Sequence, residues 1–115
     1  MKDKNTNTLI ILDDEPLIVR QLERYMRIQG LDVRSFHKIA DVLSCVTATK
    51  EKSRLMFLLD CAIRDDIMNG IDLSIRLMDE FQVRAPMICF LTAYHDDYKA
   101  LMPVNISKEQ VFQKP

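Results

Sequence analysis

Short, continuous apolar runs alternate with stretches of helical period along the whole chain, and this alternation limits the fold more than any other feature. Three runs are apolar at successive positions: 9–12 (LIIL), 55–59 (LMFLL) and 87–91 (MICFL). A strand of this kind is covered on both faces, as in a parallel sheet between helices. The run at 31–36 (LDVRSF) mixes in polar residues, as an edge strand does, and 110–113 (QVFQ) is a weaker fifth strand.

The intervening segments carry the helical period. Asp14 is the predicted cap of a first helix, with Pro16 in its first turn and Gly30 at its end. Apolar side chains recur at helical spacing in three further segments, which are 39–46, 71–81 and, more weakly, 95–102. The predicted order is therefore β-α-β-α-β-α-β-α-β. Right-handed crossovers then give an α/β fold with a parallel sheet.

Length and composition predict one small soluble domain. The chain has 115 residues, of which 48% are hydrophobic and 29% charged, and its net charge is −1. This near-neutral charge does not indicate a surface that binds nucleic acid or an anionic membrane. No apolar run is long enough to span a bilayer. The polar start, with a predicted tail at 1–7, has no signal-peptide core, and the three cysteines fit reduced thiols. We therefore expect a cytoplasmic protein.

Polar side chains follow four of the five predicted strands, at the point where each strand ends. Asp13 and Asp14 follow the first strand, Asp60 the third, Thr92 the fourth and Lys114 the last. The carboxyl ends of the strands share one edge of an open parallel sheet, and ligands bind there. We therefore expect three carboxylates, a hydroxyl and an ammonium at one place.

Three carboxylates cannot crowd together as anions without a counter-charge. A hard divalent cation supplies it, and Mg²⁺ is typically held by a few carboxylates, waters and phosphate oxygens. Asp60 is the candidate nucleophile, because a carboxylate can take a phosphoryl group. Lys114 and the Thr92 hydroxyl would bind the charge on the transferred group.

Some of these residues have a structural alternative. Asp13 and Asp14 can also cap the first helix and interact with its dipole. Asp60 has few structural explanations, since a lone carboxylate after five apolar residues is costly to bury. Cys61 adjoins the predicted nucleophile, but without a basic partner it is interpreted as a structural thiol.

Several motifs together resemble the receiver domain of two-component response regulators, the CheY-like superfamily. They are LIILDDEP at 9–16, FLLD at 57–60, NGIDL at 69–73, FLTAY at 90–94 and QKP at 113–115. The resemblance spans nearly the whole chain, in the order of the family. It implies a flavodoxin-like, doubly wound sheet of five strands in the order 2-1-3-4-5, and a signal receiver rather than an enzyme.

The resemblance also implies roles for individual residues. Asp60 would accept a phosphoryl group from the phosphohistidine of a sensor histidine kinase or from a phosphotransfer protein. Asp13 and Asp14 would coordinate Mg²⁺ with Asp60 and the backbone carbonyl of Ala62. Thr92 and Lys114 would contact the phosphoryl oxygens.

Two departures from the family pattern leave an alternative open. The loop from Asp60 to Gly70 is two residues longer than the common spacing. At the position where the family usually has a switching aromatic, this chain has Val111, and the adjacent Phe112 would point to the other face. The alternative is an interaction module that keeps the fold and signals without phosphate. A stand-alone phosphatase is a distant third, because no general acid or substrate cap is recognisable.

The receiver family normally continues into a fifth helix that packs beside the first. The motifs place the whole sequence, 1–115, in one receiver domain that reaches Pro115 before that helix. We therefore expect an apolar patch on the side of the last strand and the first helix. By the same resemblance, an output domain beyond residue 115 and a homodimer are expected partners.

Overall fold

A single parallel sheet forms the centre of the molecule. The computed structural model describes residues 7–61, 69–93, 102, 103 and 105–114. The strands are β1 (Thr8–Leu12), β2 (Asp32–Phe36), β3 (Leu55–Asp60), β4 (Ile88–Thr92) and β5 (Val111–Gln113). They are parallel throughout and lie in the order β2-β1-β3-β4-β5. The predicted strand order is confirmed, and so is the edge position of the polar strand β2.

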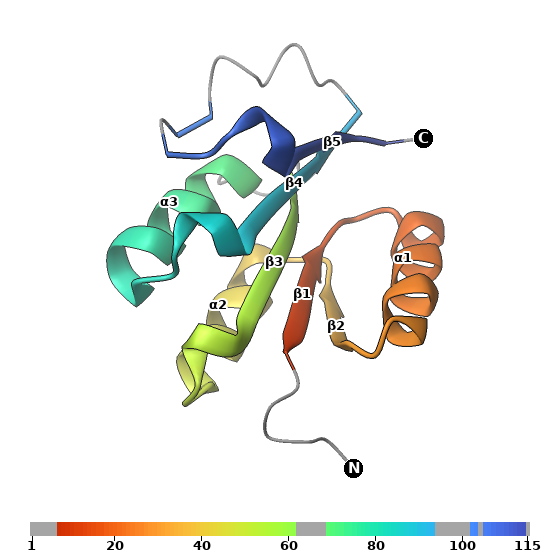
Figure 1. The fold of residues 1–115 in the computed structure, drawn as a ribbon, viewed down its shortest axis with the longest axis horizontal. Helices are drawn as coiled ribbons and strands as arrows, with labels where there is room; N and C mark the ends of the chain where they lie inside the picture. Colours follow the sequence, from red (N-terminus) through yellow and green to blue (C-terminus); the bar gives the residue numbers. More distant parts are fainter. Residues whose placement is uncertain (1–6, 62–68, 94–101, 104, 115) are drawn as a thin grey trace.

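Helices cover both faces of this sheet (Figure 1). α1 (Pro16–Ile28) lies on one face, and α2 (Ile39–Ala48) and α3 (Gly70–Phe81) lie on the other. Short 3-10 turns occur at Lys52–Arg54, Ala85–Met87 and Lys108–Gln110. The predicted fourth helix, 95–102, falls outside the described residues except for Met102. None of the described helices is long and apolar enough to cross a membrane.

The start of α1 corrects one prediction. The N-cap is Glu15 rather than Asp14, and no side chain caps the helix. The reason is Pro16, which occupies the first helical position and forces the residue before it into an extended conformation. At the other end Gly30 has a φ of 89°, and its N–H donates to the Arg27 carbonyl at 3.0 Å. The predicted end at this glycine is confirmed.

The two faces of the sheet hold two separate apolar clusters. On the face of α2 and α3, strand side chains such as Ile10, Phe57, Leu59 and Phe90 are at most 1% exposed. On the face of α1 the cluster consists of Leu9, Ile11, Val33, Leu58 and Leu91, with Ile18, Leu22 and Met26 partly buried against it. Successive strand residues alternate between the clusters, as the pleat requires.

The α1 face is open beside its helix. A cavity of about 500 Å³, here called the apolar groove, lies between α1 and the strands β3, β4 and β5. Its lining includes Leu22 and Met26 of α1, Met56 and Leu58 of β3, Cys89 and Leu91 of β4, and Phe112 of β5. Phe112 is 50% exposed, whereas Val111 packs against the cluster on the opposite face. The predicted apolar patch and the opposite orientations of these two residues are both confirmed.

Candidate functional site

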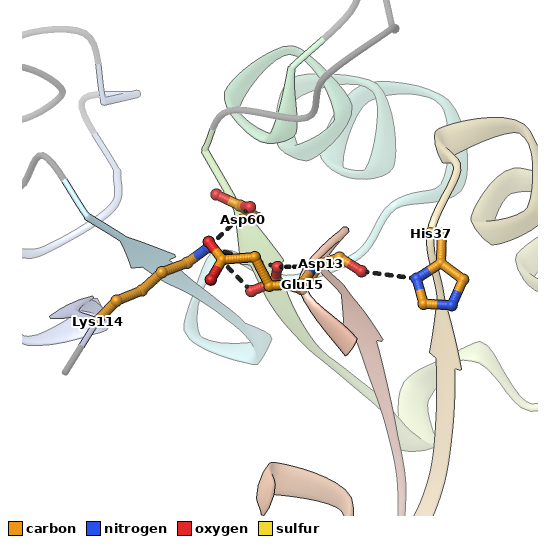
Figure 2. Close-up of polar contacts among 5 residues, drawn as sticks. All are labelled: Asp13, Glu15, His37, Asp60 and Lys114. Atoms are coloured by element: carbon orange, nitrogen blue, oxygen red, sulfur yellow. Dashed lines mark hydrogen bonds and ion pairs between the residues drawn. The ribbon is translucent and has the colours of Figure 1, made fainter. Parts of the chain in front are cut away.

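The carboxyl edge of the sheet brings the predicted polar residues together. Asp13 follows β1, Asp60 and Thr92 are the last residues of β3 and β4, and Lys114 follows β5. Asp13, Asp60 and Thr92 are almost fully buried. Figure 2 shows the Lys114 side chain reaching along this edge to Asp13 and Asp60. The expected meeting of carboxylates and ammonium is thus present in the structure.

Lys114 is the electrostatic centre of the site. Its Nζ lies 3.0 Å from Asp60 Oδ2, 3.1 Å from Asp13 Oδ2 and 3.0 Å from Glu15 Oε1. Its side chain is only 5% exposed, so these attractions are stronger than they would be in bulk water. Burial alone lowers the pKa of Lys114, but the hydrogen bonds to Glu15, Asp60 and Asp13 outweigh it and raise that pKa above its ordinary value. The ammonium is therefore charged at neutral pH.

Asp13 is fixed through its backbone and one carboxylate oxygen. Its N–H donates to the Phe36 carbonyl at 3.1 Å, and its own carbonyl lies 3.0 Å from His37 Nδ1. Oδ1 accepts a hydrogen bond from the Glu15 N–H at 2.9 Å. Oδ2 is buried and accepts no hydrogen bond among the described residues, although the Lys114 ammonium is 3.1 Å away.

The Lys114 ammonium offsets the cost of burying this carboxylate oxygen, which would otherwise be high. Ligand atoms of Asp13, Asp14 and Glu15 lie within 4.8 Å of one another, and Asp60 approaches Asp13 across the shared ammonium. Hard divalent cations bind to oxygen donors of this kind. This acidic cluster fits the divalent-cation site of receiver domains. The predicted backbone ligand, Ala62, lies outside the described residues.

The backbone around Asp60 is held by very close packing. The N–H of Cys61 donates to the Leu91 carbonyl at 3.3 Å, and the N–H of Gly70 donates to the Cys61 carbonyl at 3.2 Å. A Cβ at Gly70 would lie 2.0 Å from the Asp60 carbonyl oxygen. Only glycine permits this approach, so the start of α3 rests directly on the end of β3. Asn69 caps α3 in a reciprocal pair with Asp72.

Thr92 and Cys61 lie beside the carboxylates. The Thr92 carbonyl accepts a hydrogen bond from the Lys114 N–H at 2.8 Å, which ties β4 to the residue after β5. Burial, followed by the nearby charge of Asp60, raises the pKa of the Cys61 thiol to about 12, against smaller opposing effects of Thr92 and Lys114. A thiol that stays protonated is a poor nucleophile, which supports the structural interpretation of Cys61.

Two residues at the site were not predicted. Glu15 contacts Lys114 directly, and its sequence signal is its position in the same acidic run as Asp13 and Asp14. His37 contacts the Asp13 carbonyl. It follows β2 immediately, so the same rule of polar residues at strand ends would have found it.

The comparisons with known proteins identify the family of the chain. The family model of the response regulator receiver domain matches residues 9–115. This chain belongs to the response regulator receiver domain family. The comparison with curated protein sequences gave no match.

Solved structures share the fold at low sequence identity. A CheY-like receiver domain protein from Methanospirillum hungatei aligns with a TM-score of 0.75 at 16% identity, over 96% of this chain and 83% of that one. The response regulator TrrA from Thermotoga maritima, solved with Mg²⁺ and BeF, has a TM-score of 0.72 at 16% identity, over 96% and 88% of the two chains.

A third structure carries a modified residue. It is a response regulator from Burkholderia pseudomallei with a phosphorylated aspartic acid, a calcium ion and citrate. It has a TM-score of 0.73 at 24% identity, and the alignment covers 95% of this chain and 60% of that one. These likenesses agree with the flavodoxin-like fold that the strand order gives.

Proposed function

We propose that this domain is a phosphoacceptor that takes a phosphoryl group onto Asp60 from the phosphohistidine of a sensor histidine kinase or of a phosphotransfer protein. One observation carries the proposal. The buried Asp60 carboxylate lies 3.0 Å from the buried Lys114 ammonium, and the buried Oδ2 of Asp13 lies 3.1 Å from the same ammonium. The candidate nucleophile Asp60, the positively charged Lys114 and the candidate metal ligand Asp13 therefore lie together at one edge of the sheet.

A divalent cation, Mg²⁺ in this proposal, would be held by Asp13, Asp14 and Asp60, with the Ala62 carbonyl as the expected backbone ligand. When bound, such a cation neutralises charge on the transferred phosphoryl group. The Thermotoga and Burkholderia structures, solved with magnesium and calcium respectively, support this assignment. So does the chemistry of the donors, which are all oxygens.

The residues of the chain supply the rest of the reaction. A carboxylate oxygen of Asp60 attacks phosphorus, and a new O–P bond forms. The P–N bond to the donor imidazole breaks, and its electron pair returns to the ring nitrogen. Lys114 and the Thr92 hydroxyl bind the charge on the equatorial oxygens. Phosphoryl transfer needs little beyond this positioning and electrostatic stabilisation.

The product of the proposed reaction is the phosphorylated domain itself, which acts as a signal. The phosphoryl group adds negative charge where Lys114 and Thr92 join β4 and β5, and it would shift a two-state equilibrium of the adjoining surface. In this proposal the domain works in the cytoplasm and catalyses only its own phosphorylation and dephosphorylation. An output domain beyond residue 115 or a second copy would respond to the change.

Mass spectrometry after incubation with Mg²⁺ and a small phosphodonor, such as acetyl phosphate or phosphoramidate, tests the proposal. Wild type should gain about 80 Da, and Asp60→Asn should gain nothing because the nucleophilic oxygen is lost. Asp79→Asn removes an exposed carboxylate of α3 and is the matched control, which should be modified like wild type. Wild type that stays unmodified with small donors and with histidine kinases would overturn the proposal.

A second function is favoured by one residue. Val111 on β5 is partly buried against the α2 and α3 face, at the position where the family usually carries a switching aromatic. An interaction module that acts without phosphate would need no such switch. Full activity of Asp60→Ala in the host would support this second function against the first.

A further inference from the structure

Glu15 differs from the other carboxylates that contact Lys114. Its side chain is 47% exposed, whereas those of Asp13 and Asp60 are 1% and 5% exposed. All three nevertheless approach Nζ to within 3.0–3.1 Å. Glu15 is thus the one carboxylate partner of the ammonium, among the described residues, that is half-exposed and so lies at the rim of the site; Figure 2 shows it beside Lys114 and Asp13.

A divalent cation and Lys114 compete for the same oxygens. The ammonium contacts Asp13 Oδ2 and Asp60 Oδ2, and both residues are assigned above to the cation. Two positive centres at one pair of buried carboxylates repel each other strongly, because the surroundings screen them poorly. Lys114 must therefore withdraw from these oxygens when the cation binds. Glu15 belongs to the same acidic cluster, but it is the most exposed of the three carboxylates that contact Lys114 in the described residues, and the proposed cation site of Asp13, Asp14 and Asp60 does not use it.

We propose that Glu15 is a positioning residue for Lys114. While a divalent cation occupies Asp13 and Asp60, Glu15 holds the Lys114 ammonium at the rim of the site. When the phosphoryl group arrives, the ammonium leaves Glu15 and binds the phosphoryl oxygens. The inference rests on the proposed function and adds the resting position of Lys114 to it. Lys114 then has two alternative anionic partners, one before phosphoryl transfer and one during it.

The backbone of Glu15 suits this role. Its N–H is tied to Asp13 Oδ1 at 2.9 Å, and the following Pro16 restricts its backbone to the extended conformation seen here. The Cα is therefore fixed beside the site. The half-exposed carboxylate can still change rotamer in solvent, so it can follow the ammonium over a short distance.

Two measurable consequences follow. Without Glu15, the displaced ammonium loses the one carboxylate partner among the described residues that the cation leaves to it, so binding of Mg²⁺ to the unphosphorylated protein should weaken about three- to tenfold. At saturating Mg²⁺ the phosphorylation rate of a variant without Glu15 should instead rise about threefold or more. The ion pair between Glu15 and Lys114 stabilises the ground state more than the transition state, so its loss lowers the barrier to phosphoryl transfer.

Calorimetric titration with Mg²⁺ alone, at about 150 mM salt to screen distant charges, measures the first consequence. The proteins are wild type, Glu15→Gln and the control Glu80→Gln. Glu80 has a similarly exposed side chain at 52% and its own ion pair with Arg76 at 2.9 Å on α3. We expect weaker binding for Glu15→Gln and unchanged binding for Glu80→Gln.

A double-mutant cycle separates a contact through Lys114 from a general effect of acidic charge. In a Lys114→Gln background there is no ammonium to hold, so Glu15→Gln should change Mg²⁺ affinity less than twofold. A loss of the same size in both backgrounds would overturn the inference, as would equal Mg²⁺ affinity of wild type and Glu15→Gln.

The phosphorylation rate at saturating Mg²⁺ is then compared between wild type and Glu15→Gln. A rate that is unchanged or lower in the variant contradicts the release step. A wild type that takes no phosphoryl group contradicts the proposed function instead, and the Mg²⁺ titrations still decide the role of Glu15 in the cation-bound state.

Discussion

The two faces of the sheet are built by the same strands but are closed to different degrees. On the α2 and α3 face, Leu59 and Phe90 are fully buried. On the α1 face, the apolar groove of about 500 Å³ lies beside α1. The strands carry apolar side chains on both sides, so the described helices that pack on each face contribute to how well it is sealed.

The candidate site lies at the edge where the two faces meet. Asp60 directly follows Leu59, and Thr92 directly follows the groove residue Leu91. On the sealed side, Gly70 brings the start of α3 against the Asp60 carbonyl. The site is therefore anchored from the closed face, and a defect on that face should affect it more than a defect in the groove.

The largest expected difference comes from two neighbouring leucines of β3. Leu59→Ala should lower the free energy of unfolding by about 4 kcal/mol, because it leaves an enclosed cavity among α2, α3 and the sheet. Leu58→Ala should cost about 2 kcal/mol, because Leu58 lines the groove and its removal widens a space that is already open. Urea denaturation of both variants measures the two values.

The same residue type in the same strand makes each variant the control of the other. Equal losses in the two variants would mean that the groove face is packed as tightly as the opposite face. The comparison of the faces would then be wrong.

The strand order and the grouping of polar residues could be predicted because both follow from short-range patterns. Apolar runs at successive positions marked strands covered on both sides, and the shared carboxyl edge of parallel strands placed Asp60 and Lys114 together. The apolar side chains that line the groove were also predictable, because Leu58 and Leu91 belong to runs that are apolar at successive positions.

What the sequence did not reveal depends on side-chain direction and local backbone restraint. Residue preference predicted Asp14 as the helix cap, but Pro16 at the first helical position placed the boundary at Glu15. Glu15 was missed as a site residue because it lies two residues beyond Asp13, outside the strand end, and reaches Lys114 only through the direction of its side chain. No periodic pattern encodes such a contact.

A smaller effect is expected for a substitution at Gly70, where the start of α3 contacts the end of β3. Gly70→Ala places a methyl group where the Asp60 carbonyl oxygen would be 2.0 Å away, so β3 and α3 must move apart. We expect a loss of about 2 kcal/mol in the free energy of unfolding, as for an overpacked core. The phosphorylation rate should also fall, because the Asp60 carboxylate moves with its backbone.

Leu58→Ala is the control for Gly70→Ala, since it should destabilise the fold by a similar amount from the groove side. Rates are measured where both variants remain folded. If Leu58→Ala slows phosphorylation as much as Gly70→Ala does, lost stability explains the effect and the anchoring role of Gly70 is wrong.

The smallest expected effect lies on the rim of the groove. Phe112 is 50% exposed, so Phe112→Ser removes little buried area and should cost about 1 kcal/mol or less of unfolding free energy. It should also reduce the fluorescence of an apolar dye such as ANS, because the ring lines the groove that such a dye would enter. Gln113→Ser changes the exposed neighbour and should alter neither value. If Phe112→Ser instead destabilised the protein as much as Leu59→Ala, its ring would be closing the α1 face, and the groove would not be open in solution.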